Sequence, residues 1–245
     1  MHSDNNNWFV NWFDTPYYHT LYKKRNKNEA SQFLDLLLNF LHPNKEASFL
    51  DLACGKGRHS IYLNEKGYSV TGLDLSANSI EMAKQFETKS LKFLIHDMRH
   101  LLAGHSFDYI LSLFTSFGYF NDPLEDILVI KNVKQSLNPN GIFVLDYFNA
   151  SKPNLNFDIQ FTKVIDGVQF DIIKTIEGDR IIKKIDVTDN EKVFNYSEQV
   201  RIYSCERLKQ LLEQEGLTVL NVFGSYNLEP YNELTCDRLI VVAKN

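Results

Sequence analysis

Short apolar runs alternate with segments of helical periodicity between residues 48 and 145, and turn-forming residues separate them. Each apolar run has the length of a buried strand, and apolar residues recur at helical spacing in the segments between the runs. Strands that alternate with helices in this way build a parallel sheet covered by helices. Five strands are expected, at residues 48–53, 68–74, 91–95, 107–114 and 142–145.

The segments on either side of this core extend the predicted fold. An aromatic-rich lead at residues 8–22 precedes a leucine-rich helix that stops before Pro43. At residues 155–203 the pattern changes to β-branched alternation, and three dipeptides of hairpin-turn type predict four antiparallel strands. These dipeptides are residues 166–167, 178–179 and 189–190. Ser204 then caps a further helix. Two closing strands are expected at residues 217–223 and 238–243.

The expected architecture is α/β, with a Rossmann-like, doubly wound sheet of seven strands whose last two form an antiparallel hairpin. The Rossmann-like domain comprises residues 1–153, which include the aromatic lead, and residues 204–245. Residues 154–203 form an inserted four-stranded antiparallel β subdomain. This meander is longer than a plain connection, and loops at the carboxyl edge of such sheets carry function. We therefore expect it to be either a substrate lid or the contact of a homodimer.

Charge and composition argue against several classes of binding partner. The formal net charge of −5 argues against nucleic acid, because phosphate binding depends on clustered Lys and Arg. No apolar window is long enough to span a membrane, and the first residues lack the features of a secretory signal, so a cytoplasmic location is expected. The three cysteines are far apart and odd in number, which fits neither a disulfide framework nor zinc, so buried thiols and no metal are expected.

A glycine turn follows the first strand, in the stretch Asp51-Leu52-Ala53-Cys54-Gly55-Lys56-Gly57. Glycine lets the backbone approach a ligand closely, and in a doubly wound sheet this turn lies where nucleotides bind. Asp74 ends the second strand, where a carboxylate can accept hydrogen bonds from ribose hydroxyls, and Asp97 ends the third. Together, the glycine turn and the two acids predict a binding site for an adenosine moiety. The alternative is that both acids only cap the helices that follow them.

The order of these motifs resembles that of the class I S-adenosylmethionine-dependent methyltransferases. Residues 51–57, 72–76, 96–98 and 107–112 resemble the first four motifs of that family. The resemblance implies S-adenosyl-L-methionine as cofactor and S-adenosyl-L-homocysteine as product. It places the methionine part at the glycine turn, the ribose at Asp74 and the adenine beside Asp97 and Met98. The cofactor residues it implies are Asp51, Ala53, Gly55, Gly57, Asp74, Leu75, Asp97, Met98, Leu113 and Phe114, with Tyr22 and Arg25 of the lead closing the site.

The segment after the fourth strand indicates which subclass of methyltransferase the sequence resembles. It lacks the Asn-Pro-Pro-Tyr type motif of base-amine methyltransferases and the Pro-Cys of the cytosine C5 type, and Ser112 stands where the magnesium-dependent enzymes place an acid. Residues 114–119 and the β insertion resemble the small-molecule group that includes glycine and sugar-amine N-methyltransferases. The implied reaction is in-line methyl transfer to a nitrogen or oxygen nucleophile, with catalysis mainly by positioning in a water-poor pocket.

Residues at strand ends that face the insertion are the candidates for acceptor contact. They are Tyr119, Asp146 and Asn149, with Tyr196 and Arg201 on the insertion itself. Tyr119 and Tyr147 are the candidate catalytic residues, and the identity of the acceptor stays open. Two other functions are considered: a NAD-dependent oxidoreductase, disfavoured because Ser60 stands where a third glycine is needed, and a non-catalytic protein that binds S-adenosylmethionine.

Overall fold

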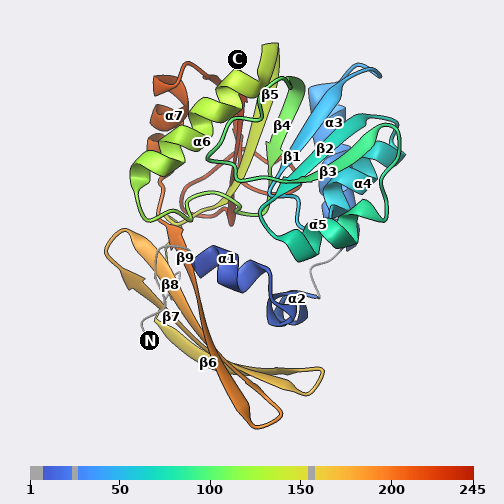
Figure 1. Cartoon of the computed structure of the whole chain (residues 1–245). Coiled ribbons are helices and arrows are strands. Elements are labelled where there is room, and N and C mark those ends of the chain that lie inside the picture. Colours follow the sequence, from blue (N-terminus) through green and yellow to red (C-terminus); the bar gives the residue numbers. More distant parts are fainter. Residues whose placement is uncertain (1–7, 24–26, 154–157) are drawn as a thin grey trace. The chain divides into compact units, whose positions relative to one another are not determined.

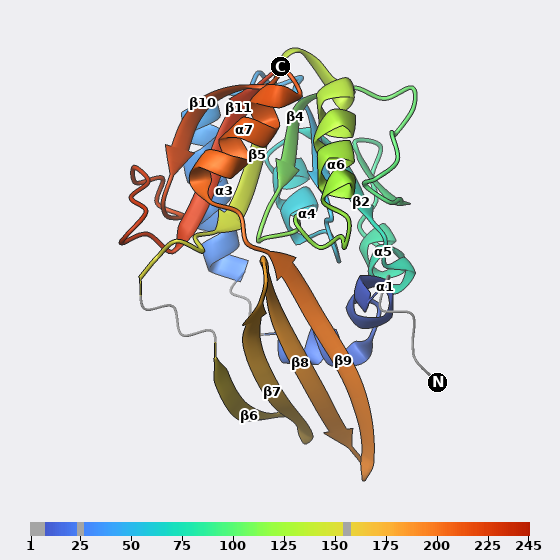
Figure 2. The same cartoon turned by 90° about the vertical axis from the view of Figure 1, so that its left-hand side faces the viewer.

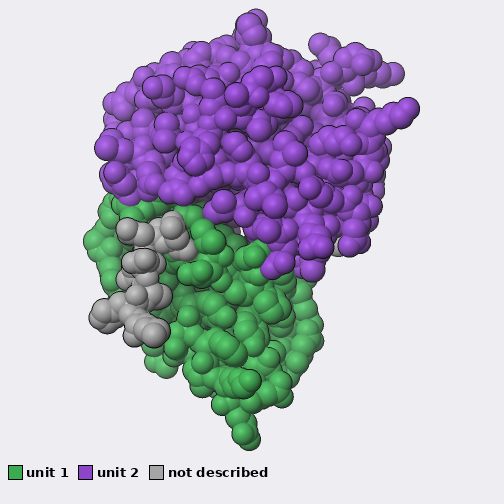
Figure 3. Space-filling view, in the orientation of Figure 1, with its two compact units in different colours: residues 1–25, 118–121, 154–202 green, residues 26–117, 122–153, 203–245 purple. Residues whose placement is uncertain are grey.

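Figure 1 shows the computed structural model of the chain, which describes residues 8–23, 27–153 and 158–245. The chain divides into two compact units (Figure 3). Unit 1 consists of residues 1–25, 118–121 and 154–202, and unit 2 of residues 26–117, 122–153 and 203–245. Each unit is therefore assembled from segments that are far apart in the sequence.

Unit 2 contains a seven-stranded sheet with the order β10-β11-β5-β4-β1-β2-β3. Its strands are β1 (Ser48–Leu52), β2 (Ser69–Asp74), β3 (Leu91–Ile95), β4 (Phe107–Ser112), β5 (Leu137–Phe148), β10 (Thr218–Phe223) and β11 (Arg238–Lys244). The first five pair in parallel, whereas β11 runs antiparallel to both β5 and β10. The predicted fold class, with its closing antiparallel pair, is confirmed.

Helices cover both faces of this sheet (Figures 1 and 2). They are α3 (Lys27–Leu41), α4 (Arg58–Glu65), α5 (Ala77–Lys84), α6 (Pro123–Ser136) and α7 (Cys205–Gln214). Figure 2 shows α6 and α7 in front of the sheet and α3 and α4 behind it. Two expected caps are present: the hydroxyl of Ser76 accepts from the Ser79 amide at 3.0 Å, and that of Ser204 accepts from the Arg207 amide at 3.1 Å.

The core of unit 2 lies between the strands and the helices α3, α4 and α5. Phe33, Leu34 and Leu37 of α3 are at most 1% exposed and pack against buried residues of the central strands. Strands with helices on both faces are apolar along their whole length, because neither face reaches water. In β11 every residue from Leu239 to Ala243 is fully buried. This packing holds the carboxyl ends of the strands on a rigid support.

Most boundaries of the predicted strands agree with the structure to within one residue, and the larger differences are in β4 and β5. β4 ends at Ser112 and not at Phe114, because Phe114 and Thr115 have positive φ angles of 59° and 62°, which a strand cannot accommodate. β5 begins at Leu137, although the sequence pattern places this residue in the preceding helix. Leu137 pairs with Phe107, and a register shift follows before regular pairing resumes further along β5. The turn expected at residues 139–141 is thus an irregularity within β5.

Unit 1 contains an antiparallel meander of four strands in the order β6-β7-β8-β9. They are β6 (Ile159–Ile165), β7 (Val168–Glu177), β8 (Arg180–Asp189) and β9 (Lys192–Arg201). Two turns lie at the expected residues. The third is formed by Asn190 and Glu191, one residue later than expected, because Asp189 still pairs with Lys192 and both turn residues take the positive φ of a tight hairpin.

The aromatic lead forms α1 (Trp8–Phe13) and α2 (Pro16–Leu21). Trp12 is completely buried, and its ring lies 4.8 Å from that of Tyr196 on β9. By its contacts the lead groups with the meander in unit 1, whereas the sequence boundaries assign it to the Rossmann-like domain. Aromatic packing explains the difference, since Trp12 finds its partner on β9.

The three cysteines have free thiols, and only Cys54 is buried, so the expectation of buried thiols does not hold for the half-buried Cys205 and Cys236. Across the described ranges, no helix has the length and apolar character needed to cross a membrane.

Candidate active site

The turn between β1 and α4 has three residues with positive φ, Ala53 at 61°, Gly55 at 56° and Gly57 at 77°. The two glycines serve different purposes. A Cβ atom on Gly57 would lie 2.5 Å from ring carbons of Phe93, so close packing against β3 excludes any side chain there. A Cβ atom on Gly55 would meet nothing within 4 Å. The backbone at Gly55 therefore borders open space, which a ligand can occupy.

Asp74, at the end of β2, joins two turns at the carboxyl edge of the sheet. One carboxylate oxygen accepts from the Gly55 amide at 2.7 Å, and the other accepts from the Ser76 amide at 2.8 Å. An ionised carboxylate has about four acceptor positions, so further hydrogen bonds to the same group are feasible. The acid predicted to hold a ribose thus lies directly beside the open glycine turn.

Asp51 lies beneath this turn and is 1% exposed. Its carboxylate accepts from the Ser60 hydroxyl at 2.6 Å, which connects β1 to α4. Burial raises the pKa of Asp51 to about 6, although the Ser60 hydrogen bond and the charge of Arg58 act in the opposite direction. A buried acid at this position provides negative potential next to the glycine turn.

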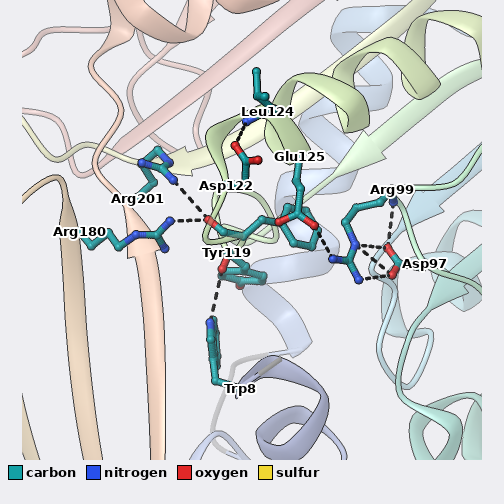
Figure 4. A network of polar contacts seen from close by, with 10 residues as sticks. Trp8, Asp97, Arg99, Tyr119, Asp122, Leu124, Glu125, Arg180 and Arg201 are labelled. Carbon is teal, nitrogen blue, oxygen red and sulfur yellow. Dashed lines mark hydrogen bonds and ion pairs between the residues drawn. The ribbon is translucent and has the colours of Figure 1, made fainter. Parts of the chain in front are cut away.

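Asp97 follows β3 and forms an ion pair with Arg99 at 2.6 Å, and Arg99 forms a second with Glu125 of α6 at 2.6 Å (Figure 4). Burial alone would raise the pKa of Asp97, but the hydrogen bonds and charge of Arg99 outweigh it and lower that pKa. The backbone carbonyl of Met98 accepts from the Asn132 amide group at 3.2 Å. Both residues predicted to border an adenine are therefore fixed by contacts with neighbouring side chains.

Phe114 connects the end of β4 to the first turn of α4. Its ring stacks on that of His59 with centroids 5.1 Å apart, and the guanidinium of Arg58 lies 4.3 Å from its centroid. His59 is 6% exposed, in agreement with a packed histidine. The residue before Phe114, Leu113, is 3% exposed and belongs to the core. The partly buried Phe114 ring thus links the loop after β4 to α4, and Leu113 anchors the same loop in the core.

Asp146, near the end of β5, is fully buried and surrounded by protein donors. The Phe114 amide donates to it at 2.7 Å, the Tyr226 hydroxyl at 3.2 Å and the Arg238 guanidinium at 2.8 Å. Burial raises the pKa of Asp146 although Arg238 opposes this effect. Because its oxygens are engaged in this way, Asp146 anchors the loop after β4, and the structure does not present it as a group for acceptor contact.

Tyr147 and Asn149 lie inside unit 2. Tyr147 is 0% exposed and packs against Phe117 and Tyr203. The side-chain amide of Asn149 donates to the carbonyls of Glu233 and Cys236 at 2.8 and 2.9 Å. Neither side chain is thus presented to an acceptor, because the first fills the core and the second holds the connection between β10 and β11.

Sequence reasoning missed this connection, because it interpreted the last two strands as a plain hairpin. The connection and α3 line an open cavity of about 530 Å³ within unit 2. Its lining residues are Glu29, Gln32, Phe33, Gly224, Ser225, Tyr226, Asn227, Glu229, Thr235, Cys236, Asp237 and Arg238. Tyr226 also packs between Phe33 and Phe114. The signal that could have found it is length, since residues 224–237 far exceed a tight hairpin turn.

The remaining acceptor candidates lie in unit 1. The Tyr119 ring lies 5.5 Å from that of Trp8, whose indole nitrogen donates to the Tyr119 carbonyl at 3.4 Å (Figure 4). Arg201 is 7% exposed, forms an ion pair with Asp179 and donates to the carbonyls of residues 120 and 121. Arg201 therefore holds the segment at residues 118–121 in place, whereas the half-buried Tyr119 and Tyr196 belong to the aromatic cluster of the lead.

Within unit 1, Tyr22 binds an acid of the meander, and its closing of the cofactor site stays a prediction. Its hydroxyl lies 2.7 and 2.8 Å from the two carboxylate oxygens of Glu198, which also accepts from the Trp12 indole at 2.7 Å and pairs with Lys183 at 3.0 Å. Arg25, predicted to act with Tyr22, lies outside the described residues. The cofactor candidates at the strand ends therefore share unit 2, and Tyr22 groups with unit 1.

A family model described as a methyltransferase domain matches residues 22–222. This range includes most of the seven-stranded sheet and the whole meander. The chain belongs to the methyltransferase domain family. Among its relatives are the putative methyltransferase YqeM of Bacillus subtilis (strain 168) and glycine N-methyltransferase of Rattus norvegicus. The first is 36% identical over 111 residues, which cover 44% of this chain and 45% of the relative. The second is 30% identical over 145 residues, which cover 53% and 50%. The chain thus spans about half the length of these two relatives.

A solved structure supports the same conclusion at the level of the fold. An S-adenosylmethionine-dependent methyltransferase from Clostridium acetobutylicum ATCC 824 superposes with a TM-score of 0.79 and 22% sequence identity, covering 93% of this chain and 96% of that one. The family model and this structure together confirm the predicted resemblance to class I S-adenosylmethionine-dependent methyltransferases.

Proposed function

We propose that this methyltransferase-family chain transfers the methyl group of S-adenosylmethionine to an amino nitrogen of a small molecule and releases S-adenosylhomocysteine. The observation that carries the proposal is the 2.7 Å hydrogen bond from the Gly55 amide to Asp74, because an acid that could accept from ribose hydroxyls then lies at the backbone of an open glycine turn. The relative named glycine N-methyltransferase supports nitrogen as the acceptor atom.

The residues at the carboxyl edge fit each part of this cofactor. Asp74 would accept hydrogen bonds from the ribose hydroxyls, and the open backbone at Gly55 leaves room for the methionine part. Asp51 provides buried negative potential, which suits the ammonium group of that part. Asp97 and Met98, fixed by Arg99 and Asn132, would border the adenine.

The chemistry requires positioning more than proton transfer. The bound cofactor would supply a methyl group on a sulfonium. The lone pair of the acceptor nitrogen would form the new bond to the methyl carbon, and the electrons of the broken carbon–sulfur bond would stay on sulfur. The chain contributes a rigid support, because the loop at Phe114 is tied to Asp146 and to α4. Alignment of two reactants in a water-poor site can supply roughly 7–11 kcal/mol. The proton of the acceptor amine leaves to solvent.

Calorimetry on the purified chain tests the cofactor, with S-adenosylhomocysteine as ligand and NAD as competitor. Asp74→Ala is expected to weaken binding roughly 10- to 100-fold, since hydrogen bonds to a charged group contribute about 1.5–3 kcal/mol each. Glu81→Ala, at an exposed position on α5, is the matched control and should bind like the parent chain. Binding of NAD alone would support the oxidoreductase, and binding without turnover on any acceptor would support a non-catalytic role.

The proposal also gives the β insertion a role. We keep residues 154–203 as an inserted subdomain that encloses the acceptor or contacts a second copy. Replacement of this segment by a short linker should leave S-adenosylhomocysteine binding intact and abolish turnover or lower the oligomeric mass.

The expected cytoplasmic location is tested by fractionation of cells that express the tagged chain.

A further inference from the structure

Arg99 lies between two carboxylates of unit 2, as Figure 4 shows. On one side its guanidinium binds Asp97, which accepts from Nη2 at 2.6 Å and from Nε at 3.1 Å. On the other side Nη1 donates to Glu125 of α6 at 2.6 Å. The backbone amide of Arg99 also donates to Asp97, at 2.9 Å. We name Asp97, Arg99 and Glu125 the acid–arginine–acid triad.

The triad is partly buried, and it connects two segments that are far apart in the sequence. The side chains of Asp97, Arg99 and Glu125 are 15%, 23% and 31% exposed. Glu125 is in the first turn of α6, where the Asp122 carboxylate caps the Leu124 amide at 2.9 Å. A guanidinium presents its donors in a planar fork of fixed geometry. Arg99 therefore holds the Asp97 carboxylate in one direction relative to the start of α6.

The charge balance of the triad favours a ligand that donates hydrogen bonds. Two carboxylates share one guanidinium, so the triad carries one excess negative charge. Among the residues that the structure describes, the donors to the Asp97 carboxylate are the backbone amide, Nε and Nη2 of Arg99. A carboxylate offers about four acceptor positions, so these N–H groups leave room for a donor from a ligand. Glu125 prevents Arg99 from neutralising Asp97 alone.

We propose that Arg99, held by Glu125, is a positioning residue through which Asp97 selects adenine over hypoxanthine in the cofactor. The inference rests on the proposed function, which places the adenine beside Asp97. Asp74 pairs with Ile95, so Asp97 lies one strand away from the acid proposed for the ribose. An ionised carboxylate only accepts hydrogen bonds, so it fits the amino group of adenine and repels the carbonyl oxygen that hypoxanthine has in its place.

The ionisation of Asp97 depends on the same contacts. Burial would raise the pKa of Asp97, but the hydrogen bonds and the charge of Arg99 lower it. A protonated Asp97 could donate to the carbonyl oxygen of hypoxanthine and would no longer distinguish the two bases. Arg99 thus supports the selection in two ways, because it fixes the direction of the carboxylate and keeps the group an acceptor.

The test compares S-adenosylhomocysteine with S-inosylhomocysteine by calorimetry on the full chain. The two ligands differ in the amino group of adenine, which is a carbonyl oxygen in the inosyl form. The parent chain is expected to bind the adenosyl form roughly 10- to 100-fold more tightly, because hydrogen bonds to a charged group are strong. Arg99→Met should reduce this ratio roughly tenfold, because Asp97 then loses the donors that fix and ionise it. Equal binding of both ligands by the parent chain overturns the proposal.

Further variants separate positioning from a merely structural role. Arg99→Lys keeps the charge but not the planar fork, so it should restore only part of the ratio that Arg99→Met loses. Glu125→Gln should lower the ratio by less than Arg99→Met, because Arg99 itself remains. Arg207→Met, at an exposed position on α7, is the matched control and should keep the ratio of the parent chain.

The ratio distinguishes the possible outcomes. A structural defect weakens both ligands equally and leaves the ratio unchanged, so an unchanged ratio in either Arg99→Met or Glu125→Gln overturns the proposal. An equal fall of the ratio in Arg207→Met overturns the assignment to the triad. Binding of neither ligand to the parent chain refutes the proposed function together with this inference, whereas an unchanged ratio refutes the inference alone.

Discussion

Substitution of the two turn glycines by alanine should have opposite consequences. In Gly57→Ala the new methyl group would lie 2.5 Å from the Phe93 ring, which is 0% exposed and cannot move away. Overpacking of this kind costs about 1–3 kcal/mol, and the left-handed backbone at φ 77° adds about 1–2 kcal/mol for a residue with a Cβ atom. The free energy of unfolding is therefore expected to fall by about 2–5 kcal/mol.

In Gly55→Ala only the backbone contribution applies, because nothing lies within 4 Å of the added atom. The free energy of unfolding is expected to be about 1–2 kcal/mol lower than that of the parent chain. The methyl group would, however, enter the open space proposed for the cofactor, so S-adenosylhomocysteine should bind at least tenfold more weakly. Urea denaturation and calorimetry on the two variants measure both quantities. Equal losses of stability, or undiminished binding by Gly55→Ala, would refute this division of roles.

Three further substitutions test the buried polar groups. The pKa of Asp51 is about 6 in the folded chain against an ordinary value of 3.8, so the folded state holds the proton more tightly and stability falls as the pH rises from about 4 to above 6. Asp51→Asn should remove that part of the pH dependence in urea denaturation at pH 4–7, and an unchanged slope would contradict it. Arg238→Met leaves the buried Asp146 carboxylate without its counter-ion, which should cost about 3–5 kcal/mol, and adding Asp146→Asn should recover part of the loss. A double variant no more stable than the single one would argue against the ion pair as the cause. Tyr22→Phe removes a hydrogen bond to Glu198 and should lower the thermal midpoint by a few degrees, as scanning calorimetry would measure.

Most of the fold could be predicted from local patterns in the sequence. The central strands of unit 2 are buried by helices on both faces, so apolar runs such as residues 48–53 identified them directly. Ser76 and Ser204 mark helix starts because a cap involves only residues close in sequence. The loop at Phe114 could not be predicted in this way. Its left-handed backbone depends on a hydrogen bond to Asp146, which lies 32 residues further along the chain.

The position of a candidate residue was predictable where it follows from the place of its strand in the sheet. Asp74 lies beside the glycine turn because the carboxyl ends of parallel strands share one edge. The hydrogen bonds of Asn149 and Arg201 could not be predicted, because their partners come from distant segments: Asn149 binds carbonyls 84 and 87 residues away, and Arg201 one that is 81 residues away. A strand-end position alone cannot distinguish a polar residue that faces a ligand from one that anchors a loop.

The interleaved segments of unit 1 have a consequence for the order of folding during synthesis. Trp12 leaves the ribosome early, yet the strand that covers it, β9, ends only at Arg201. Domains usually fold as units from the amino terminus, but here the lead must remain exposed until Arg201 has been made. Its aromatic side chains are then an apolar surface on the nascent chain, and a chaperone that binds such surfaces should associate with this protein until translation passes β9.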